Sequence, residues 1–392
     1  MYSLITIMKS YLIILTVFCI SIIKTNAQSY NTFYGGIVTN CSYDSIEQHL
    51  IDFENLGIKE PGTAALNNTL DWLISHYQSY GYTDIIIDTF TYNGNEVYNL
   101  IITKTGTHYP NTYFVLDGHY DTKTGTGTND NGSGTSIILE TARLMKNVDT
   151  KFSVKFIHFS MEEVGLVGST HYVNNIAFPN GMDIKLLFNI DEVGGVNGMV
   201  NNTIVCERDQ ANPTAANDAS WAYTDTLATC VELYSNLFTT ISYAYASDYM
   251  PFQAKDYVIT GLFEDHYSPY AHTLGDSLGN MDIPYVFEIA KGTIGASLYF
   301  AEAYETTGIE ELNENNFSIY PNPAKDILTI KAENNQFPTT VKLINAIGEI
   351  VISETITSNI KLIDVKNLPA GIYYLAIEDK INTQYKKIII SN

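Results

Sequence analysis

The stretch Thr112-Tyr-Phe-Val-Leu-Asp117, followed at once by Gly118-His-Tyr-Asp121, decides the fold class of this chain. Its run of large apolar residues is typical of a short strand that is buried on both faces. The same arrangement recurs downstream, where apolar runs at 153–160 and 185–190 are each followed by acidic residues. Several strands followed by polar side chains predict a sheet with a binding site at the edge where these strands end.

Helical patterns alternate with these strands. In 133–146, for example, Ile138, Ala142 and Met145 recur on one helical face. Further helical patterns lie at 46–80, 165–175, 217–238 and 284–304, and strand-like runs at 84–91, 97–103 and 260–264. Strands alternating with helices predict an α/β fold with a mostly parallel central sheet and helices on both faces. Ligands of such sheets bind beyond the carboxyl ends of the strands.

The composition is that of a folded and strongly acidic chain of 392 residues. Hydrophobic residues make up 45% of the sequence and charged residues 16%, which excludes a disordered protein. The 21 Lys and Arg are outnumbered by 43 Asp and Glu, giving a net charge of −22. We therefore expect neither nucleic acid nor an anionic lipid surface as a partner.

The first 27 residues resemble a secretory signal peptide. Lys9 precedes the apolar run Tyr11–Ile23, and Thr25-Asn26-Ala27 suits cleavage after Ala27. The run is short for a membrane span, although an uncleaved N-terminal anchor is the alternative. No later stretch approaches about 18 apolar residues, so we expect no stable membrane span after signal cleavage.

Export permits disulfides, and the mature chain keeps three cysteines. We predict a Cys206–Cys230 pair, because both lie in one Asn- and Pro-rich excursion, and a free Cys41. Three buried thiols remain compatible with the sequence.

The C-terminal segment differs from the rest of the chain in charge and pattern. Residues 28–316 hold 11 basic and 36 acidic residues, whereas residues 317–392 hold eight and seven. Short alternating strands are expected in the second segment, at 327–331, 340–344, 349–355, 360–364, 371–378 and 384–390. We predict a small all-β sandwich domain at 317–392, after a linker at 308–316.

The polar residues at the predicted strand ends form a mixed imidazole and carboxylate set suited to Zn²⁺. Two metal ions would use this many carboxylates better than one, with a single carboxylate as the bridge. Asp130, in a Gly- and Asn-rich loop, has the setting for that bridge. The candidates are His119, Asp121, Asp130, Glu162, Glu163, Asp191, His272 and Asp276.

The adjacent pair Glu162-Glu163 suggests a division of labour. Neighbouring residues that leave a strand point in different directions, so one carboxylate can bind metal while the other faces the activated water. A carboxylate beside that water can act as general base and return the proton to a departing amine.

Taken in order, these motifs resemble the M28 family of zinc aminopeptidases over about residues 46–304. The segments that carry the resemblance are His119-Tyr-Asp121, Asn129-Asp-Asn-Gly-Ser-Gly134, Glu162-Glu-Val-Gly-Leu-Val-Gly-Ser169, Asn189-Ile-Asp191 and His272-Thr-Leu-Gly-Asp-Ser277. The resemblance implies a phosphorylase/hydrolase-like fold and a co-catalytic pair of Zn²⁺ ions within residues 28–307.

The resemblance also implies a role for each residue. His119 and Asp191 would bind one zinc, and Glu163 and His272 the other. Asp130 would bridge the two ions, Glu162 would be the general base, and Asp121 would orient His119.

One segment departs from the family pattern. Ser247-Asp-Tyr249 stands where many relatives have Ser-Asp-His, so we expect the pocket rim around Tyr249 to differ from theirs. Outside the motifs, we interpret His158 as a core histidine, and Glu264 and His266 as candidates for a place near the site.

The tail is similar to a second family. Tyr320-Pro-Asn-Pro-Ala324, Leu368-Pro-Ala-Gly-Ile-Tyr-Tyr374 and the terminal Lys386-Lys-Ile-Ile-Ile390 resemble the type A sorting domain of the type IX (Por) secretion system of Bacteroidetes. The resemblance implies contact with that secretion machinery, export across the outer membrane, and release or attachment at the cell surface.

The sequence thus predicts a secreted dizinc aminopeptidase that acts on the N-termini of peptides or proteins. One alternative is a glutaminyl-cyclase-like acyltransferase with the same fold and a single zinc, for which Asp130, Glu163 and His272 would suffice. A second is a catalytically dead, peptidase-like binding module. The number of bound metal ions separates the three.

Overall fold

The computed structural model describes residues 29–305, 317–332, 339–378 and 383–391. The chain divides into two compact units between residues 305 and 306. The predicted signal peptide, residues 1–27, and the predicted linker, residues 308–316, lie outside the described residues.

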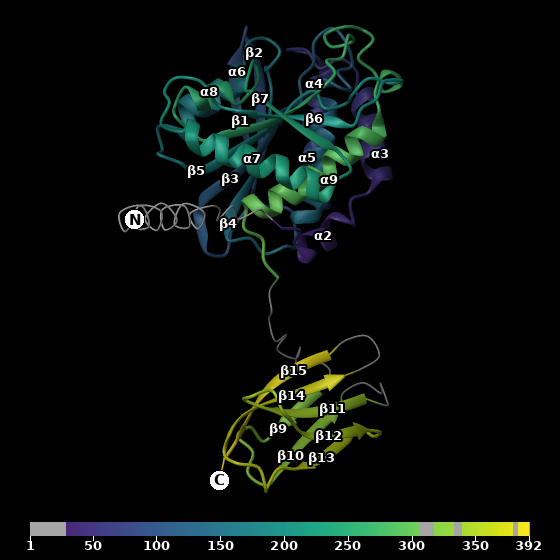
Figure 1. Ribbon diagram of the computed structural model, residues 1–392, viewed down its shortest axis with the longest axis vertical. Helices are drawn as coiled ribbons and strands as arrows, with labels where there is room; N and C mark the ends of the chain where they lie inside the picture. The colour runs from purple at the N-terminus through teal and green to yellow at the C-terminus, as the bar shows by residue number, and fades with distance from the viewer. Residues whose placement is uncertain (1–28, 306–316, 333–338, 379–382, 392) are drawn as a thin grey trace, which may run out of the picture. The chain divides into compact units, whose positions relative to one another are not determined.

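The first unit is built on a mixed sheet packed against helices (Figure 1). The sheet has eight strands in the order β1-β2-β4-β3-β5-β8-β6-β7. Its centre is parallel: β3 pairs in parallel with β4 and β5, and β5 with β8. The pairs β1/β2, β2/β4 and β6/β8 are antiparallel, and β6/β7 is parallel. The strands are β1 Ile85–Tyr92, β2 Asn95–Lys104, β3 Tyr109–His119, β4 Phe152–Phe159, β5 Asp183–Ile190, β6 Thr203–Arg208, β7 Phe238–Tyr243 and β8 Ile259–Glu264.

Helices cover both faces of this sheet, as the sequence predicts. Phe114 and Leu116 of β3 pack into one apolar cluster and Val115 between them into another, because successive side chains of a strand point to opposite faces. One face packs against α3 Tyr43–Asn55, α4 Ala64–Ser79, α5 Gly132–Met145, α7 Asn217–Tyr234 and α9 Ile283–Phe300. The other packs against α6 Val167–Tyr172, its π-helical continuation Val173–Ala177 and α8 Met250–Gln253.

Two further helical segments complete the first unit, namely α2 Thr32–Val38 and a 3₁₀ turn at Leu278–Asn280. None of the helices in the described ranges combines the length and apolar character that a bilayer span requires.

The second unit is an all-β sandwich, also as predicted. One sheet has the order β13-β10-β9 and the other β12-β11-β14-β15, with antiparallel neighbours throughout. Leu328 and Ile330 from the first sheet share one core with Leu343, Leu375 and Ile388 from the second. The strands are β9 Phe317–Tyr320, β10 Ile327–Ala332, β11 Thr339–Asn345, β12 Ile350–Ile356, β13 Ile360–Asp364, β14 Gly371–Glu378 and β15 Thr383–Ile390.

The predicted Cys206–Cys230 disulfide is wrong. Cys206 is a thiol on β6, and both Cys206 and Cys230 are fully buried in the apolar cluster between the sheet and α7. The segment taken for a loose excursion is a strand followed by a helix. A thiol packs in such a core as a small apolar side chain, so it needs no partner.

Candidate metal centre

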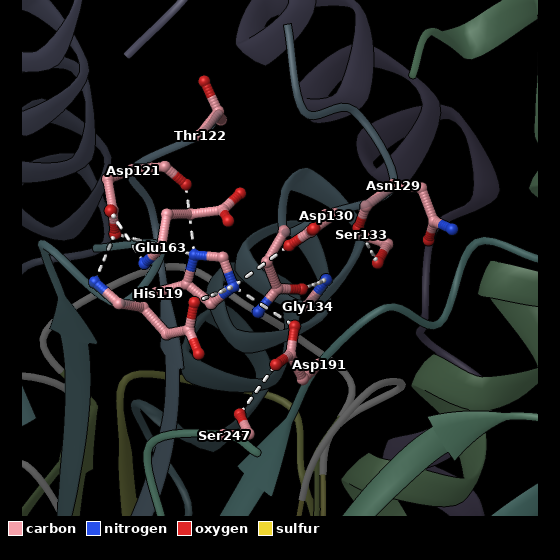
Figure 2. A network of polar contacts seen from close by, with 12 residues as sticks. His119, Asp121, Thr122, Asn129, Asp130, Ser133, Gly134, Glu163, Asp191 and Ser247 are labelled. Atoms are coloured by element: carbon pink, nitrogen blue, oxygen red, sulfur yellow. Dashed lines mark hydrogen bonds and ion pairs between the residues drawn. The ribbon is translucent and has the colours of Figure 1, made fainter. Parts of the chain in front are cut away.

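The strand order brings the predicted site residues to one edge of the sheet. His119 is the last residue of β3, Glu162 and Glu163 follow β4, and Asp191 follows β5. Because β3, β4 and β5 are parallel neighbours, their carboxyl ends lie side by side. Figure 2 shows His119, Asp130, Glu163 and Asp191 converging there.

The first cluster of donor atoms centres on the ring of His119. Its Nε2 lies 3.2 Å from Asp130 Oδ1 and 3.2 Å from Asp191 Oδ1. One atom from each of the three residues falls within 4.8 Å of the others, and all three side chains are buried. This is a compact set of one nitrogen and two carboxylate donors.

The second cluster shares Asp130. Its Oδ2 lies 3.1 Å from His272 Nε2, which is also 2.8 Å from Glu163 Oε2. His272 comes from the segment after β8 and has the left-handed φ of 57°, a backbone conformation that costs about 1–3 kcal/mol in a non-glycine residue. The two oxygens of Asp130 therefore face different clusters.

Asp121 supports both strand ends at once. Its carboxylate accepts hydrogen bonds from the backbone N–H groups of Glu162 and Glu163, at 3.1 and 3.3 Å. The ring Nδ1 of His119 lies 3.1 Å from the Asp121 carbonyl oxygen and 3.6 Å from its carboxylate. The sequence suggested only the contact with His119. The hydrogen bonds from Asp121 to the backbone of Glu162 and Glu163 depend on the pairing of β3 with β4.

Asp276 holds the loop that carries Asp130. Its carboxylate accepts the backbone N–H groups of Asn129 and Asp130, at 2.7 and 3.1 Å. Glu264, for which the sequence suggested an orienting place, accepts the amide of Asn129 at 3.1 Å and the backbone N–H of Gly195 at 2.7 Å.

Ser247, in the segment that departs from the family pattern, supports Asp191 through a contact that the sequence did not predict. Its hydroxyl donates to Asp191 Oδ2 at 2.7 Å (Figure 2). The same hydroxyl accepts from the amide of Asn189 at 2.9 Å. A serine hydroxyl carries no recognisable spacing to β5, so only the fold reveals the contact.

Burial of the glutamate carboxylates, with repulsion from neighbouring acids added to it, is the main electrostatic feature of the site. Burial, with Asp191 and Asp248 adding to it, raises the pKa of Glu162 to about 10, and burial with Asp130 raises the pKa of Glu163 to about 8. Burial opposes protonation of His119, but Asp191 and Glu162 outweigh it and raise the pKa of that ring well above its usual value. Cations placed among the carboxylates would stabilise their charged forms and so lower their pKa values.

A pocket of about 470 Å³ opens over the clusters. Asp130, Glu162, Glu163, Asp191 and His272 line its floor. Its walls are mainly apolar and aromatic, formed by Leu166, Tyr245, Ala246, Met250, Phe263 and Tyr267.

Three further residues with sequence-based expectations do not line this pocket. Tyr249 is not a rim residue: it is buried, and its hydroxyl donates to Glu207 Oε2 at 2.9 Å. His158 is a core histidine, fully buried, as predicted. His266 is exposed, pairs with Asp265 at 3.4 Å and does not line the pocket.

Comparison with known families assigns both units. Residues 99–295, about half of the chain, match the family described as Peptidase family M28. Residues 318–391 match the secretion system C-terminal sorting domain.

Several curated proteins are similar over part of the first unit. Leupeptin-inactivating enzyme 1 of Streptomyces exfoliatus is 34% identical over 146 residues, 36% of this chain and 33% of that protein. Aminopeptidase YwaD of Bacillus subtilis is 42% identical over 87 residues, 22% of this chain and 19% of that protein. The matched segments span a third or less of these relatives.

Solved structures share the fold. The aminopeptidase LapA of Legionella pneumophila superposes with a TM-score of 0.61 at 21% identity, over 73% of this chain and 79% of that one. A glutaminyl cyclase of Macrostomum lignano gives 0.60 at 14% identity, over 72% and 94%. At these identities the likeness concerns the fold, which both kinds of enzyme share.

Proposed function

The chain belongs to peptidase family M28, and from this premise we propose that it is a secreted dizinc aminopeptidase that releases the N-terminal residue of peptides or proteins. One observation carries the proposal: two clusters of donor atoms share Asp130, each contains a histidine, and each offers one oxygen of Asp130. If the site held a single ion, one of the two donor clusters would bind no metal.

The residues present fit a pair of zinc ions. His119 and Asp191 would hold one ion, Glu163 and His272 the other, and Asp130 would bridge them. Glu163 Oε1 is buried with no hydrogen-bond partner among the described residues, as expected of a metal-binding carboxylate. When bound, the ions would supply Lewis-acid chemistry, activating water and polarising the scissile carbonyl.

Neighbouring groups fix the ligands in place. A neutral His119 ring with its proton on Nδ1 would donate to the Asp121 carbonyl and leave the Nε2 lone pair free for a cation. Ser247 orients Asp191 in the same way, through the hydroxyl donated to Oδ2.

Glu162 would move the proton. It lines the pocket and belongs to neither donor cluster, and its Oε2 lies 3.9 Å from His119 Nε2. Its carboxylate would take a proton from the attacking water and pass it to the departing amine. Asp121, which holds the Glu162 backbone, would aim that carboxylate.

The tail suggests where the enzyme acts. The match to a secretion sorting domain supports export through type IX machinery to the cell surface or the medium, in a Bacteroidetes host. The N-terminal signal peptide would carry the chain across the inner membrane first.

Metal content and hydrolysis of aminoacyl chromogenic amides, measured on one sample, test this function. We expect two zinc ions per chain, loss of hydrolysis on chelation, and recovery when zinc is restored. One ion per chain, with cyclisation of N-terminal glutamine, would indicate the cyclase alternative. No ion and no turnover would indicate a binding module, and full activity in a metal-free sample would refute the proposal.

A further inference from the structure

One carboxylate in the pocket has no part in the machinery described above. Glu192 follows Asp191, lines the pocket and belongs to neither donor cluster. Its Oε2 is buried and has no hydrogen-bond partner among the described residues. A buried carboxylate oxygen without a partner is costly, so its place in a substrate pocket points to a ligand.

The backbone holds Glu192 in this position. Its φ of 44° is left-handed, which is uncommon outside glycine. Its carbonyl accepts the backbone N–H of Glu264 at 3.0 Å, which ties it to the end of β8. Asp191 and Glu192 thus leave β5 with distinct surroundings, one in a donor cluster and one beside β8.

The end of β8 brings aromatic rings to the same pocket. Phe263 and Tyr267 both line it and stack on each other, with ring centroids 6.3 Å apart and planes 17° apart. Tyr245 and Met250 add apolar surface. Among the described residues that line the pocket, none is a lysine or arginine that would neutralise Glu192.

We propose that Glu192 is a specificity-determining residue that selects substrates whose N-terminal residue is lysine or arginine; this inference rests on the proposed aminopeptidase function. The aliphatic part of such a side chain would pack on the aromatic and methionine wall. Its terminal cation would pair with the Glu192 carboxylate and lie near the rings of Phe263 and Tyr267. A purely apolar side chain would leave that carboxylate unpaired, which disfavours it.

The test compares lysyl and norleucyl p-nitroanilide, because norleucine has the same straight chain without the ammonium group. In the zinc-loaded wild-type enzyme, we expect kcat/KM for lysine to exceed that for norleucine by roughly ten- to a hundredfold, the range for one hydrogen-bonded charge. Glu192→Gln and Glu192→Met should bring the ratio close to one. Asp265→Asn removes a nearby acid that does not line the pocket, and should leave the ratio unchanged.

Each other outcome decides against the proposal. A wild-type enzyme that prefers norleucine overturns it. An equal loss for both substrates in Glu192→Gln would mean that Glu192 holds the α-ammonium group instead. A lower zinc content in both variants would make Glu192 a metal ligand. If the zinc-loaded wild type hydrolyses neither amide, the aminopeptidase function itself fails, and this inference falls with it.

Discussion

At the scale of single residues, Asp130 and the Glu162-Glu163 pair determine what the site can do. Asp130 offers each of its two oxygens to a different histidine. The backbone N–H groups of both glutamates donate hydrogen bonds to one carboxylate, that of Asp121. Adjacent glutamates with a common support but different surroundings suit two different tasks.

Glu162→Gln should separate those tasks. The substitution keeps the shape of the side chain and removes the base, so kcat should fall by ~10²–10⁴-fold. Zinc content and KM should change little, because Glu162 belongs to neither donor cluster. Kinetics with metal analysis on the same sample measure both.

The matched control is Glu163→Gln, which should instead lose zinc. If Glu162→Gln retained near-normal kcat, or released a metal, the roles of the two glutamates would be swapped or wrong.

At the scale of elements, the start of α5 connects the loop that carries Asp130 to the sheet. Asn131 caps the helix by accepting the N–H of Gly134 at 2.9 Å, and its amide donates to the Ile190 carbonyl at 2.8 Å. The contact is so close that a Cβ on Gly134 would lie 2.6 Å from that carbonyl oxygen. The start of α5 and the end of β5 are therefore in direct contact next to Asp130.

Asn131→Ala should disturb both stability and metal binding. Losing the cap and leaving buried groups unpaired should lower the free energy of unfolding by about 1–3 kcal/mol. Zinc affinity should also fall, because Asp130 directly precedes Asn131 and its position depends on the cap. Urea unfolding followed by tryptophan fluorescence reports the first unit alone, since Trp72 and Trp221 both lie in it.

Ser42→Ala provides the control, because Ser42 caps α3 by accepting the N–H of Ser45 at 3.1 Å and contributes to neither donor cluster. It should cost about 1 kcal/mol without affecting zinc affinity. Equal effects of both variants on zinc affinity would contradict the coupling.

The packing of α4 on β4 introduces an acid-sensitive contact. His158 is fully buried beside the Tyr77 hydroxyl, with 2.8 Å between Nε2 and that oxygen. Burial lowers the pKa of His158 to about 3, whereas an unfolded histidine has a pKa near 6.5. Below about pH 6.5 only the unfolded chain takes up this proton, so His158 costs stability increasingly as pH falls toward 3.

His158→Gln should therefore weaken the pH dependence of unfolding. In urea unfolding with chelator present, we expect the variant to have a lower free energy of unfolding than wild type at pH 7.5. The difference between the two proteins should be smaller at pH 5.5. His108→Gln changes an exposed histidine and should leave the slope as in wild type. A parallel shift at both pH values in His158→Gln would show that His158 titrates normally.

At the scale of the whole molecule, the chain joins two units of different character. The first packs its apolar residues on both faces of one sheet, and the second has a core of its own, formed by its two sheets. The acidic charge belongs to the first unit, since residues 317–392 are nearly neutral. Separate cores predict units that fold separately.

A fragment of residues 28–307 should therefore fold and retain full aminopeptidase activity, while the host cell fails to export it past the outer membrane. Activity of the purified fragment and fractionation of cells that express the shortened gene measure the two effects. The intact chain, expressed in parallel, is the control. Loss of activity in a soluble, folded fragment would place the tail in the catalytic unit.

Much of this protein follows from local patterns in the sequence. The runs before His119, Glu162 and Asp191 identify strands, and parallel strands bring their carboxyl ends together whatever the details of packing. The site residues could thus be grouped before any contact was known. The change of charge and strand pattern near residue 310 likewise separates the second unit.

Only the tertiary structure decided features that depend on contacts between distant segments. β7 is a largely exposed strand at the edge of the sheet, next to β6, so neither periodicity nor burial signalled it. Cys206 and Cys230 share a core that local composition concealed, and Tyr249 turns inward to reach Glu207. The position of Glu192 beside β8 depends on a pairing across more than 70 residues, because side-chain direction at the end of a strand is set by what packs against it.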